Sequence, residues 1–185
     1  MIQAENLRVV DDTMTDVPAD GNTMGEIVMR INYIMAGYYR DPEATAEAFR
    51  GGRFHTGDIG FIDKDGYVTL VDRKKDMILS GGFNVFPRTI EEAIYEHPSV
   101  AEVTVIGIPD AYRGQSAKAF IALKPGGAPF TFDELKAFLV DKLAKYEMPV
   151  AMEIRASLPK TPVGKLSKKE LIAEEMAKHE QAASG

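Results

Sequence analysis

Short apolar runs alternate with clusters of turn-forming residues in the first third of the chain. Leu7–Val10 and Gly25–Arg30 read as two β-strands, separated by a polar loop rich in Asp, Thr, Pro and Gly. Asp41–Pro42 predicts the start of a short helix, because Asp is a good N-cap and Pro suits the first turn. Asp63–Gly66 predicts a hairpin turn before a returning strand at Tyr67–Val71, since Asp-Gly accepts the positive φ of such turns.

After Asp76 the pattern changes to mixed helices and strands. A hydroxyl residue three positions before a glutamate can satisfy the exposed amides of a helix start reciprocally. This spacing predicts three helix starts, at Thr89/Glu92, Thr131/Glu134 and Ser167/Glu170. The middle helix is predicted to carry one apolar stripe, made of Leu135, Phe138, Leu139, Leu143 and Tyr146. Strands are predicted between the helices at Ala101–Ile108, Ala117–Leu123 and Glu153–Ala156.

Strands packed against capped helices predict a small α+β domain with a three-stranded sheet in the second part of the chain. Five consecutive charged residues, 72–76, interrupt the apolar pattern and mark the boundary with the β-rich first part. The predicted organisation is therefore a β-rich part at 1–72, a junction at 73–76 and an α+β domain at 77–185.

Composition narrows the classes of function. The chain has 185 residues, 45% of them hydrophobic and 27% charged, which is typical of a globular protein with a real core. Its net charge of −6 argues against general nucleic-acid binding. The absence of cysteine excludes disulfides and thiolate chemistry, and the three histidines show no metal-ligand spacing. No apolar run is long enough to span a membrane and no secretory signal is visible, so a cytoplasmic protein without a metal site is expected.

Two polar positions in the first part could bind a ligand. Asp58 follows Thr56-Gly57 and is predicted to lie at a turn where a strand ends; Arg73 follows Asp72 fifteen positions later. A carboxylate at a strand end can accept hydrogen bonds from two adjacent ribose hydroxyls. The same aspartate could instead bond only its own backbone in a turn.

Two further segments could likewise either bind a ligand or have only a structural role. Ser80, Gly81, Gly82 and Phe83 are compatible with a plain turn or with a backbone that approaches a ligand closely. Lys165 ends a segment, Leu158–Gly164, that two prolines and a glycine keep out of regular helix. Its ammonium could be idle in solvent or could be delivered by a flexible loop to developing negative charge.

Four segments together resemble one family. Phe54–Asp58, Val71–Ile78, Ser80–Asn84 and Pro159–Lys165 occur in this order in the adenylate-forming acyl-CoA synthetases. The resemblance extends from about Gly25 to Lys178. It implies that 1–72 are the last, β-rich part of the large AMP-binding domain and that 77–185 form the mobile C-terminal lid domain.

The resemblance also implies roles for individual residues. Asp58 and Arg73 would bind the ribose of ATP, and Lys75 would be the hinge. A solvated charged turn at this position is compatible with that role, because a hinge between domains should be exposed. Ser80, Gly81, Gly82 and Phe83 would line the pantetheine tunnel for coenzyme A. Lys165 would stabilise the charge that builds up when a carboxylate attacks the α-phosphate.

The substrates implied are ATP, coenzyme A and a carboxylic acid, with a fatty acid preferred because Pro87–Glu91 resembles the bacterial fatty-acyl branch. The family's Ser/Thr/Gly-rich phosphate loop is absent from these residues. The residues that hold the triphosphate, its Mg²⁺ and the acyl chain are therefore expected in the remainder of the AMP-binding domain, which is the expected partner of this chain. The chain alone is expected to be inactive. Two alternatives remain open: an adenylation enzyme that loads a carrier protein, and a non-catalytic module that uses the lid fold as an interaction surface.

Overall fold

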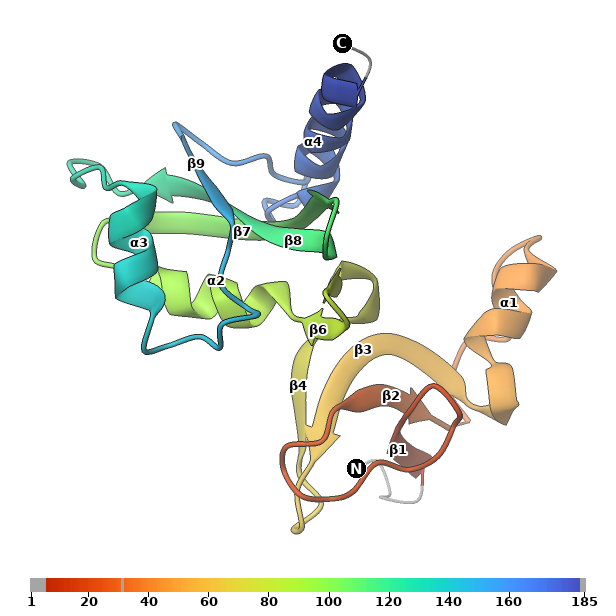
Figure 1. The fold of residues 1–185 in the computed structure, drawn as a ribbon. Helices are drawn as coiled ribbons and strands as arrows, with labels where there is room; N and C mark the ends of the chain where they lie inside the picture. The colour runs from red at the N-terminus through yellow and green to blue at the C-terminus, as the bar shows by residue number, and fades with distance from the viewer. Residues whose placement is uncertain (1–5, 31, 184–185) are drawn as a thin grey trace. The chain divides into compact units, whose positions relative to one another are not determined.

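A computed structural model describes residues 6–30 and 32–183 of the chain. The chain divides into two compact units, Met1–Lys75 and Asp76–Gly185. The division lies inside the segment 73–76 that the sequence indicates as a junction. Figure 1 traces the elements of both units in chain order.

The first unit is built on a four-stranded antiparallel sheet with the order β1-β2-β3-β4 (Figure 1). The strands are β1 (Leu7–Val10), β2 (Gly25–Met29), β3 (Phe54–Ile62) and β4 (Val68–Arg73). Helix α1 (Pro42–Ala48) and a 3₁₀ turn (Arg50–Gly52) precede β3. The strands predicted at 7–10, 25–30 and 67–71 are present, within two residues of their predicted ends.

Local side-chain chemistry sets the ends of these elements as predicted. The Asp41 carboxylate accepts the Ala44 N–H at 2.9 Å and caps α1, and Pro42 lies in its first turn. Asp63 accepts the N–H groups of Asp65 and Tyr67, both at 2.9 Å, and Gly66 has φ of 85°. The turn between β3 and β4 is therefore the predicted Asp-Gly hairpin.

The second unit contains a five-stranded sheet, with the order β6-β5-β8-β7 and with β9 parallel to β8. The strands are β5 (Ile78–Ser80), β6 (Phe83–Val85), β7 (Val100–Asp110), β8 (Gly114–Leu123) and β9 (Ala151–Arg155). The helices are α2 (Pro87–Tyr95), α3 (Phe132–Leu139) and α4 (Lys168–Ala183). The α+β class is confirmed, but the sheet has five strands, because the short hairpin β5–β6 joins the three predicted strands.

Helices cover both faces of this sheet (Figure 1). Alternate residues of β7 point to opposite faces. Val103 and Val105 pack in a core with buried side chains of α2 and α3, whereas Ile106 packs with Phe120 and with Leu171 of α4. Phe120 and Leu171 are fully buried. The start of α4, where the Lys165 segment ends, is thus fixed to the sheet by a core of its own.

One predicted helix start is confirmed and another is wrong. Thr131 and Glu134 form the reciprocal capping box of α3. Thr89, however, lies inside α2, which begins at Pro87, and among the described residues no side chain caps that end. Proline at the first position has a backbone φ already suited to a helix, so α2 has Phe86 at its N-cap position, three residues before the predicted Thr89. Ser167 immediately precedes α4, as its position in the sequence suggested.

The predicted apolar stripe of the middle helix continues beyond the helix itself. Helix α3 ends at Leu139, and 140–147 form turns and bends. Leu143 is nevertheless buried in the core, whereas Tyr146 is exposed. The Ala144 N–H donates to the Glu147 carboxylate at 2.9 Å, which holds this segment as a turn.

An ion-pair cluster lies between the sheet and α4. The Glu153 carboxylate is 3.0 Å from the Lys118 ammonium and 2.8 Å from the Arg155 guanidinium. Burial is the largest influence on the pKa of Glu153 and acts to raise it. The hydrogen bonds and charges of Lys118 and Arg155 outweigh it and lower that pKa from 4.5 to about 2. This carboxylate therefore stabilises the fold above its unfolded pKa, and the contribution is lost as pH falls toward about 2.

Replacing Glu153 should destabilise the second unit in a pH-dependent way. We expect Glu153→Gln to lower the free energy of unfolding at neutral pH by about 1–2 kcal/mol, a value reduced for solvent screening. The difference in the free energy of unfolding between the variant and wild type should be smaller at acidic pH, as the pH approaches the Glu153 pKa of about 2. Urea denaturation at neutral and at acidic pH measures this difference. Glu92→Gln is the control, because its exposed pair with Arg88 is worth about 0.5 kcal/mol or less. An equal loss at both pH values would contradict the ionic origin of the effect.

Candidate functional site

Asp58 lies inside β3 and not at the end of a strand, which corrects the prediction. The cause is a β-bulge: Val28 of β2 pairs with His55, and Glu26 pairs with Ile59, so 56–58 stand opposite a single residue of β2. Gly57, in the middle of the bulge, has φ of 71°, where glycine is favoured. The bulge re-aims the side chain that follows it.

The hydroxyl of Thr56 holds this bulge together. It donates to the Ile27 carbonyl at 2.8 Å and accepts the Asp58 N–H at 3.0 Å. No role is predicted for Thr56 from the sequence, although the tripeptide Thr56-Gly57-Asp58 contains the signal. Thr56 supplies the hydroxyl bridge, Gly57 accommodates the positive φ, and Asp58 contributes the carboxylate.

Asp58 and Arg73 stand side by side. They are direct partners in the β3–β4 register, so their side chains share one face of the sheet. The Arg73 Nε lies 3.4 Å from the Asp58 carboxylate, and Arg73 is largely exposed while Asp58 is partly exposed. The structure thus brings together the two residues predicted to bind a nucleotide and leaves both accessible to a ligand that offers hydroxyl groups. Their role in binding it stays a prediction.

A partly buried charge cluster anchors the residue before the predicted hinge. The Glu26 carboxylate lies 3.0 Å from the His55 Nδ1 and 3.1 Å from the Lys74 Nζ, and Lys74 also contacts Asp12 at 3.0 Å. Burial acts to raise the pKa of Glu26, but the hydrogen bonds from His55 and Lys74 lower it on balance. Burial acts to lower the pKa of Lys74, but its two carboxylate partners raise it on balance.

Lys75 directly follows this anchor and is exposed, in a 3₁₀ turn at Lys74–Asp76. The chain passes from one compact unit to the other here, since the first ends at Lys75 and the second begins at Asp76. The side chain of Lys74 is thus tied within the first unit, and Lys75 is the next position along the backbone. This position suits a hinge, a role that stays a prediction for Lys75.

The Ser80–Phe83 segment is a two-residue hairpin between β5 and β6. Ser80 pairs with Phe83, and Gly81 and Gly82 have φ of 59° and 85°. Two consecutive positive φ values define the turn that glycine serves best, so the glycine pair has a local structural reason. Both glycines are exposed at the tip of the hairpin, Ser80 is buried, and the Gly81 N–H donates to the Arg113 carbonyl at 2.9 Å. The tip leaves Gly82 open to a close approach, as a pantetheine tunnel would require.

Phe83, at the start of β6, connects the β5–β6 hairpin to another part of the second unit. Its ring stacks on that of Tyr146, with centroids 4.5 Å apart and planes within 10°. Both rings remain exposed. The stack links the hairpin tip to the turn that follows α3, which the sequence could not indicate because the two residues lie far apart along the chain.

Lys165 lies on a short loop that is closed by hydrogen bonds. The Thr161 N–H donates to the Lys165 carbonyl at 2.7 Å, and the Lys165 N–H donates to the Thr161 hydroxyl at 3.2 Å. At the base of the loop the Ser167 N–H donates to the Pro159 carbonyl at 2.8 Å. The segment is non-helical as predicted, but it is braced within itself. This bracing favours movement of Lys165 together with its unit over loosening of the loop.

The Lys165 side chain is exposed, and within residues 6–30 and 32–183 it forms no hydrogen bond or ion pair. Other lysines around it are engaged: Lys160 pairs with Glu102 at 2.5 Å, and Lys168 pairs with Glu91 at 3.0 Å. The loop therefore presents one ammonium group that is available to a ligand. An available cation of this kind can stabilise a phosphate-centred negative charge.

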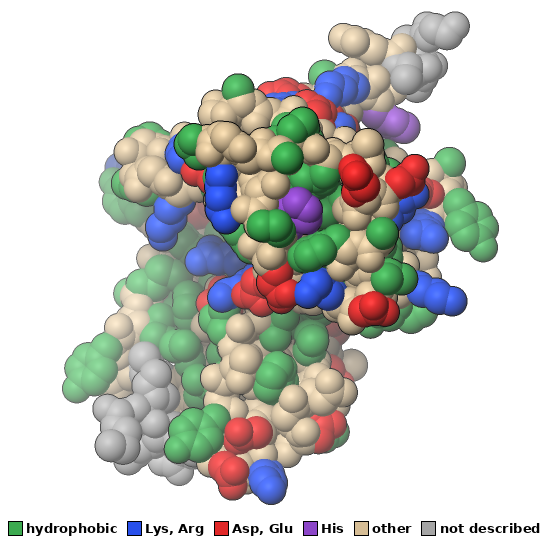
Figure 2. All heavy atoms as spheres, turned by 90° about the vertical axis from the view of Figure 1, so that its left-hand side faces the viewer, with side chains coloured by type: hydrophobic (Ala, Val, Ile, Leu, Met, Phe, Trp, Pro, Cys, Tyr) green, Lys and Arg blue, Asp and Glu red, His purple; other side chains and the backbone are tan. Residues whose placement is uncertain are grey.

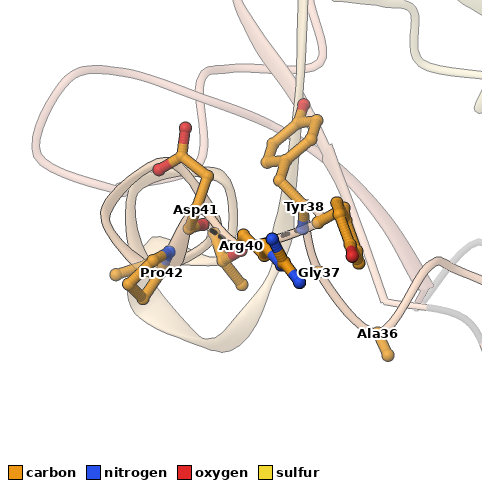
Figure 3. Close-up of a pocket in the computed structure, with 9 residues that line it drawn as sticks. Ala36, Gly37, Tyr38, Arg40, Asp41 and Pro42 are labelled. Atoms are coloured by element: carbon orange, nitrogen blue, oxygen red, sulfur yellow. Dashed lines mark hydrogen bonds between the residues drawn. The ribbon is translucent and has the colours of Figure 1, made fainter.

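An open hollow of about 630 Å³ lies beside the start of α1 and contains none of the predicted site residues. Figure 3 shows that it is formed by one continuous stretch, 36–46, which includes Tyr38, Arg40 and Asp41. Arg40 has a positive φ of 54°, and Asp41 is the helix cap, so the hollow follows from how the chain turns into α1. It does not bring polar groups together from different elements, as a binding pocket usually does.

Charges of both signs are interspersed on the face shown in Figure 2. Among the described residues no group of three or more acidic or histidine side chains is placed to hold a metal ion. Within the same residues no helix has the length and apolar character needed to cross a bilayer. The candidate residues thus fall into two groups, which are described separately: the Asp58–Arg73 pair belongs to the first unit, and the glycine hairpin and the Lys165 loop belong to the second.

The comparison with protein families agrees with these features. Residues 89–165, from α2 to the exposed lysine, match the family model of the AMP-binding enzyme C-terminal domain. Residues 89–165 therefore carry the C-terminal domain of the AMP-binding enzymes.

Individual relatives define the branch more closely. The chain is 46% identical to a long-chain-fatty-acid–CoA ligase of Bacillus subtilis (strain 168), over 84% of this chain and 28% of that protein. It is 43% identical to a 2-succinylbenzoate–CoA ligase of Geobacillus kaustophilus (strain HTA426), over 83% and 31%. The resemblance to acyl-CoA synthetases is thus confirmed, and the chain spans less than a third of the length of these two relatives.

A solved structure gives the same assignment. The ATP-bound structure of MatB from Rhodopseudomonas palustris matches with a TM-score of 0.83 and 36% identity, over 91% of this chain and 33% of that one. The match includes both units of this chain, because neither unit alone amounts to 91% of its residues. The fold expected from the resemblance is therefore present.

Proposed function

We propose that this chain is the C-terminal part of an AMP-forming acid–thiol ligase that makes acyl-CoA in two steps. In the first, a carboxylate oxygen of the acid attacks the α-phosphate of ATP and pyrophosphate leaves. In the second, the sulfur of coenzyme A attacks the acyl carbon and AMP leaves. ATP and coenzyme A would be substrates of the complete enzyme, which includes the remainder of the AMP-binding domain.

The observation that carries the proposal is the distribution of the candidate residues. Asp58 and Arg73 stand on one compact unit, Lys165 and the Gly81–Gly82 tip stand on the other, and the chain crosses between the units at the exposed Lys75. Two different half-reactions can share one site if a single junction lets one unit present two faces in turn. In this scheme Asp58 and Arg73 hold the ribose, Lys165 serves the first step and Ser80–Phe83 serve the second.

A fatty acid is our preferred substrate. The name of the Bacillus subtilis relative and the Pro87–Glu91 segment support this choice. The Geobacillus relative is named for a different acid at similar identity, so the acid has to be measured. For Mg²⁺, the described residues offer no suitable ligand group, and we assign its ligands to the remainder of the enzyme.

The proposal is tested by joining this chain to the N-terminal two thirds of a related ligase and following product by mass. We expect acyl-CoA to form from ATP, Mg²⁺, a fatty acid and coenzyme A, and we expect none from the 185 residues alone.

The same assay distinguishes the alternatives. Faster reaction with shorter or aromatic acids would reveal a different substrate preference. Acyl transfer to a carrier protein in place of coenzyme A would favour an adenylation enzyme. Robust adenylate formation by the 185 residues alone would contradict the proposal.

Removing the Asp58 charge should weaken nucleotide binding. In the joined enzyme we expect Asp58→Asn to raise the KM for ATP about tenfold or more, since a charge-assisted hydrogen bond is worth roughly 1.5–3 kcal/mol. The rate of thioester formation from preformed acyl-adenylate should change less. Asp65→Asn, in the exposed β3–β4 turn, is the matched control. An unchanged KM for ATP in Asp58→Asn would rule out the ribose contact.

A further inference from the structure

Glu91 links its own helix to two other elements at the base of the Lys165 loop. It belongs to α2, and its Oε1 accepts the Val105 N–H of β7 at 2.9 Å and lies 3.0 Å from the Nζ of Lys168, the first residue of α4. The Glu91 and Lys168 side chains are only 18% and 22% exposed. Glu91 is therefore a largely buried link between elements and not a solvated surface group.

The contact with Val105 has a clear physical reason. Strand β7 is at the edge of its sheet, so N–H groups on its outer side have no neighbouring strand. Val105 is fully buried, and a buried amide without a partner costs free energy. The Glu91 carboxylate accepts the hydrogen bond of this amide and at the same time forms an ion pair with Lys168. A glutamine could still accept the amide hydrogen bond but would lose the ion pair.

The Lys165 loop is tied to the unit at the same place. Its internal hydrogen bonds make 159–167 a braced hairpin, so its orientation depends on how the ends are held. One end is held by the pair between Lys160 and Glu102 of β7. The other end runs into α4 at Lys168, three residues after Lys165, where Glu91 holds it. Glu91 therefore helps to set the direction in which the Lys165 side chain projects from the second unit.

We propose that Glu91 is a positioning residue for Lys165: by holding Lys168 against α2 and β7, its carboxylate sets the orientation of the loop that presents the lysine. This inference rests on the proposed role of Lys165 in adenylate formation. A displacement of about 1 Å at a reacting group can cost roughly a hundredfold in rate. The loss of this tether should cost less, because the Lys160–Glu102 pair and the packing of Leu171 against the sheet remain.

The kinetic test uses the joined enzyme described above. We expect Glu91→Gln to lower the rate of adenylate formation roughly 5- to 30-fold while thioester formation from preformed acyl-adenylate stays within about twofold. In a Lys165→Ala background the same change should have no further effect, because Glu91 acts through that lysine. Glu92→Gln, one residue away on α2 and paired only on the surface with Arg88, should leave both rates unchanged.

A purely structural role would give a different pattern. Equal losses in both half-reactions, or an additive loss in the Lys165→Ala background, would overturn the proposal. A wild-type rate of adenylate formation in Glu91→Gln would overturn it as well. Lys168→Arg keeps the cation and should retain most activity, whereas Lys168→Met should reproduce the Glu91→Gln pattern.

A second measurement does not depend on activity and uses the 185-residue chain as it stands. Amide hydrogen exchange is read at Thr161, Gly164 and Lys165, whose N–H groups brace the loop. We expect Glu91→Gln to speed exchange at these amides, compared with Glu92→Gln, while the Phe120 region of the sheet keeps its protection. Unchanged loop exchange would overturn the tether. If the wild-type joined enzyme makes no adenylate, the proposed function fails, and the exchange data still decide whether Glu91 holds the loop.

Discussion

Lys165→Ala should abolish the first half-reaction and spare the second. In the joined enzyme we expect adenylate formation, measured by ATP–pyrophosphate exchange, to fall by about 100- to 1,000-fold, the range found when one preorganised charge-stabilising group is removed. Conversion of preformed acyl-adenylate to thioester should stay within a few-fold of wild type. We expect a loss confined to one step because the Lys165 side chain is exposed and has no partner among the described residues. Its removal therefore breaks no contact that the fold needs.

The control for this substitution is another exposed lysine nearby along the chain. Lys169 is exposed on the first turn of α4, and Lys169→Ala removes one positive charge four residues from Lys165. It should leave both half-reactions nearly unchanged, which separates a specific ammonium from general positive charge. Equal losses of both half-reactions in Lys165→Ala would argue that this lysine supports the fold or the assembly and not the chemistry.

Lys75→Pro should separate the two half-reactions by restricting the junction. Proline fixes φ near −65° and also restricts the residue before it, here the anchored Lys74. A hinge must absorb large changes in backbone dihedral angles, so the variant should be held in one arrangement of its units. We expect one half-reaction to fall about 100-fold and the other to remain, measured by single-turnover assays of each step.

Lys75→Ala provides the matched control for the hinge. It removes the same charged side chain but leaves the backbone free, and both half-reactions should continue at near wild-type rates. If the proline variant also runs both steps normally, the rotation does not take place at this residue. A loss of both steps accompanied by a lower melting temperature would point to a folding defect and not to a restricted hinge.

The parts of the fold that the sequence predicts are those decided by neighbouring residues. The Asp41 cap, the Asp63–Gly66 turn and the Thr131/Glu134 box each depend on side chains that reach backbone amides a few positions away. The Thr89/Glu92 box failed because Pro87, two residues upstream, starts the helix first. Sequence patterns predict least well where local signals of similar strength compete.

The features that the sequence missed are decided by distant contacts. The bulge that re-aims Asp58 needs β2 as a partner, since Thr56 bonds the Ile27 carbonyl. Strands β5 and β6 are three residues each and are too short to stand out until β8 pairs with β5. Glu91 looks like a surface residue until β7 supplies a buried amide and α4 a lysine.

Of the candidate site, the sequence located the residues but not their arrangement. It singled out Asp58 and Arg73, which the structure places side by side in one register. It also singled out Lys165 and indicated a flexible support for it, whereas the structure shows a loop braced at Thr161 and at Pro159. Motif order along a chain carries no information about such bracing, which depends on hydrogen bonds between particular atoms.

The central claim is that this chain supplies a catalytic lysine to adenylate formation from a unit of its own. The most direct measurement adds the purified 185-residue chain to a separately expressed N-terminal portion of a related ligase and records ATP–pyrophosphate exchange. We predict that the wild-type chain raises the exchange rate well above that of the N-terminal portion and that the Lys165→Ala chain does not. An equal rise with both chains would contradict the claim.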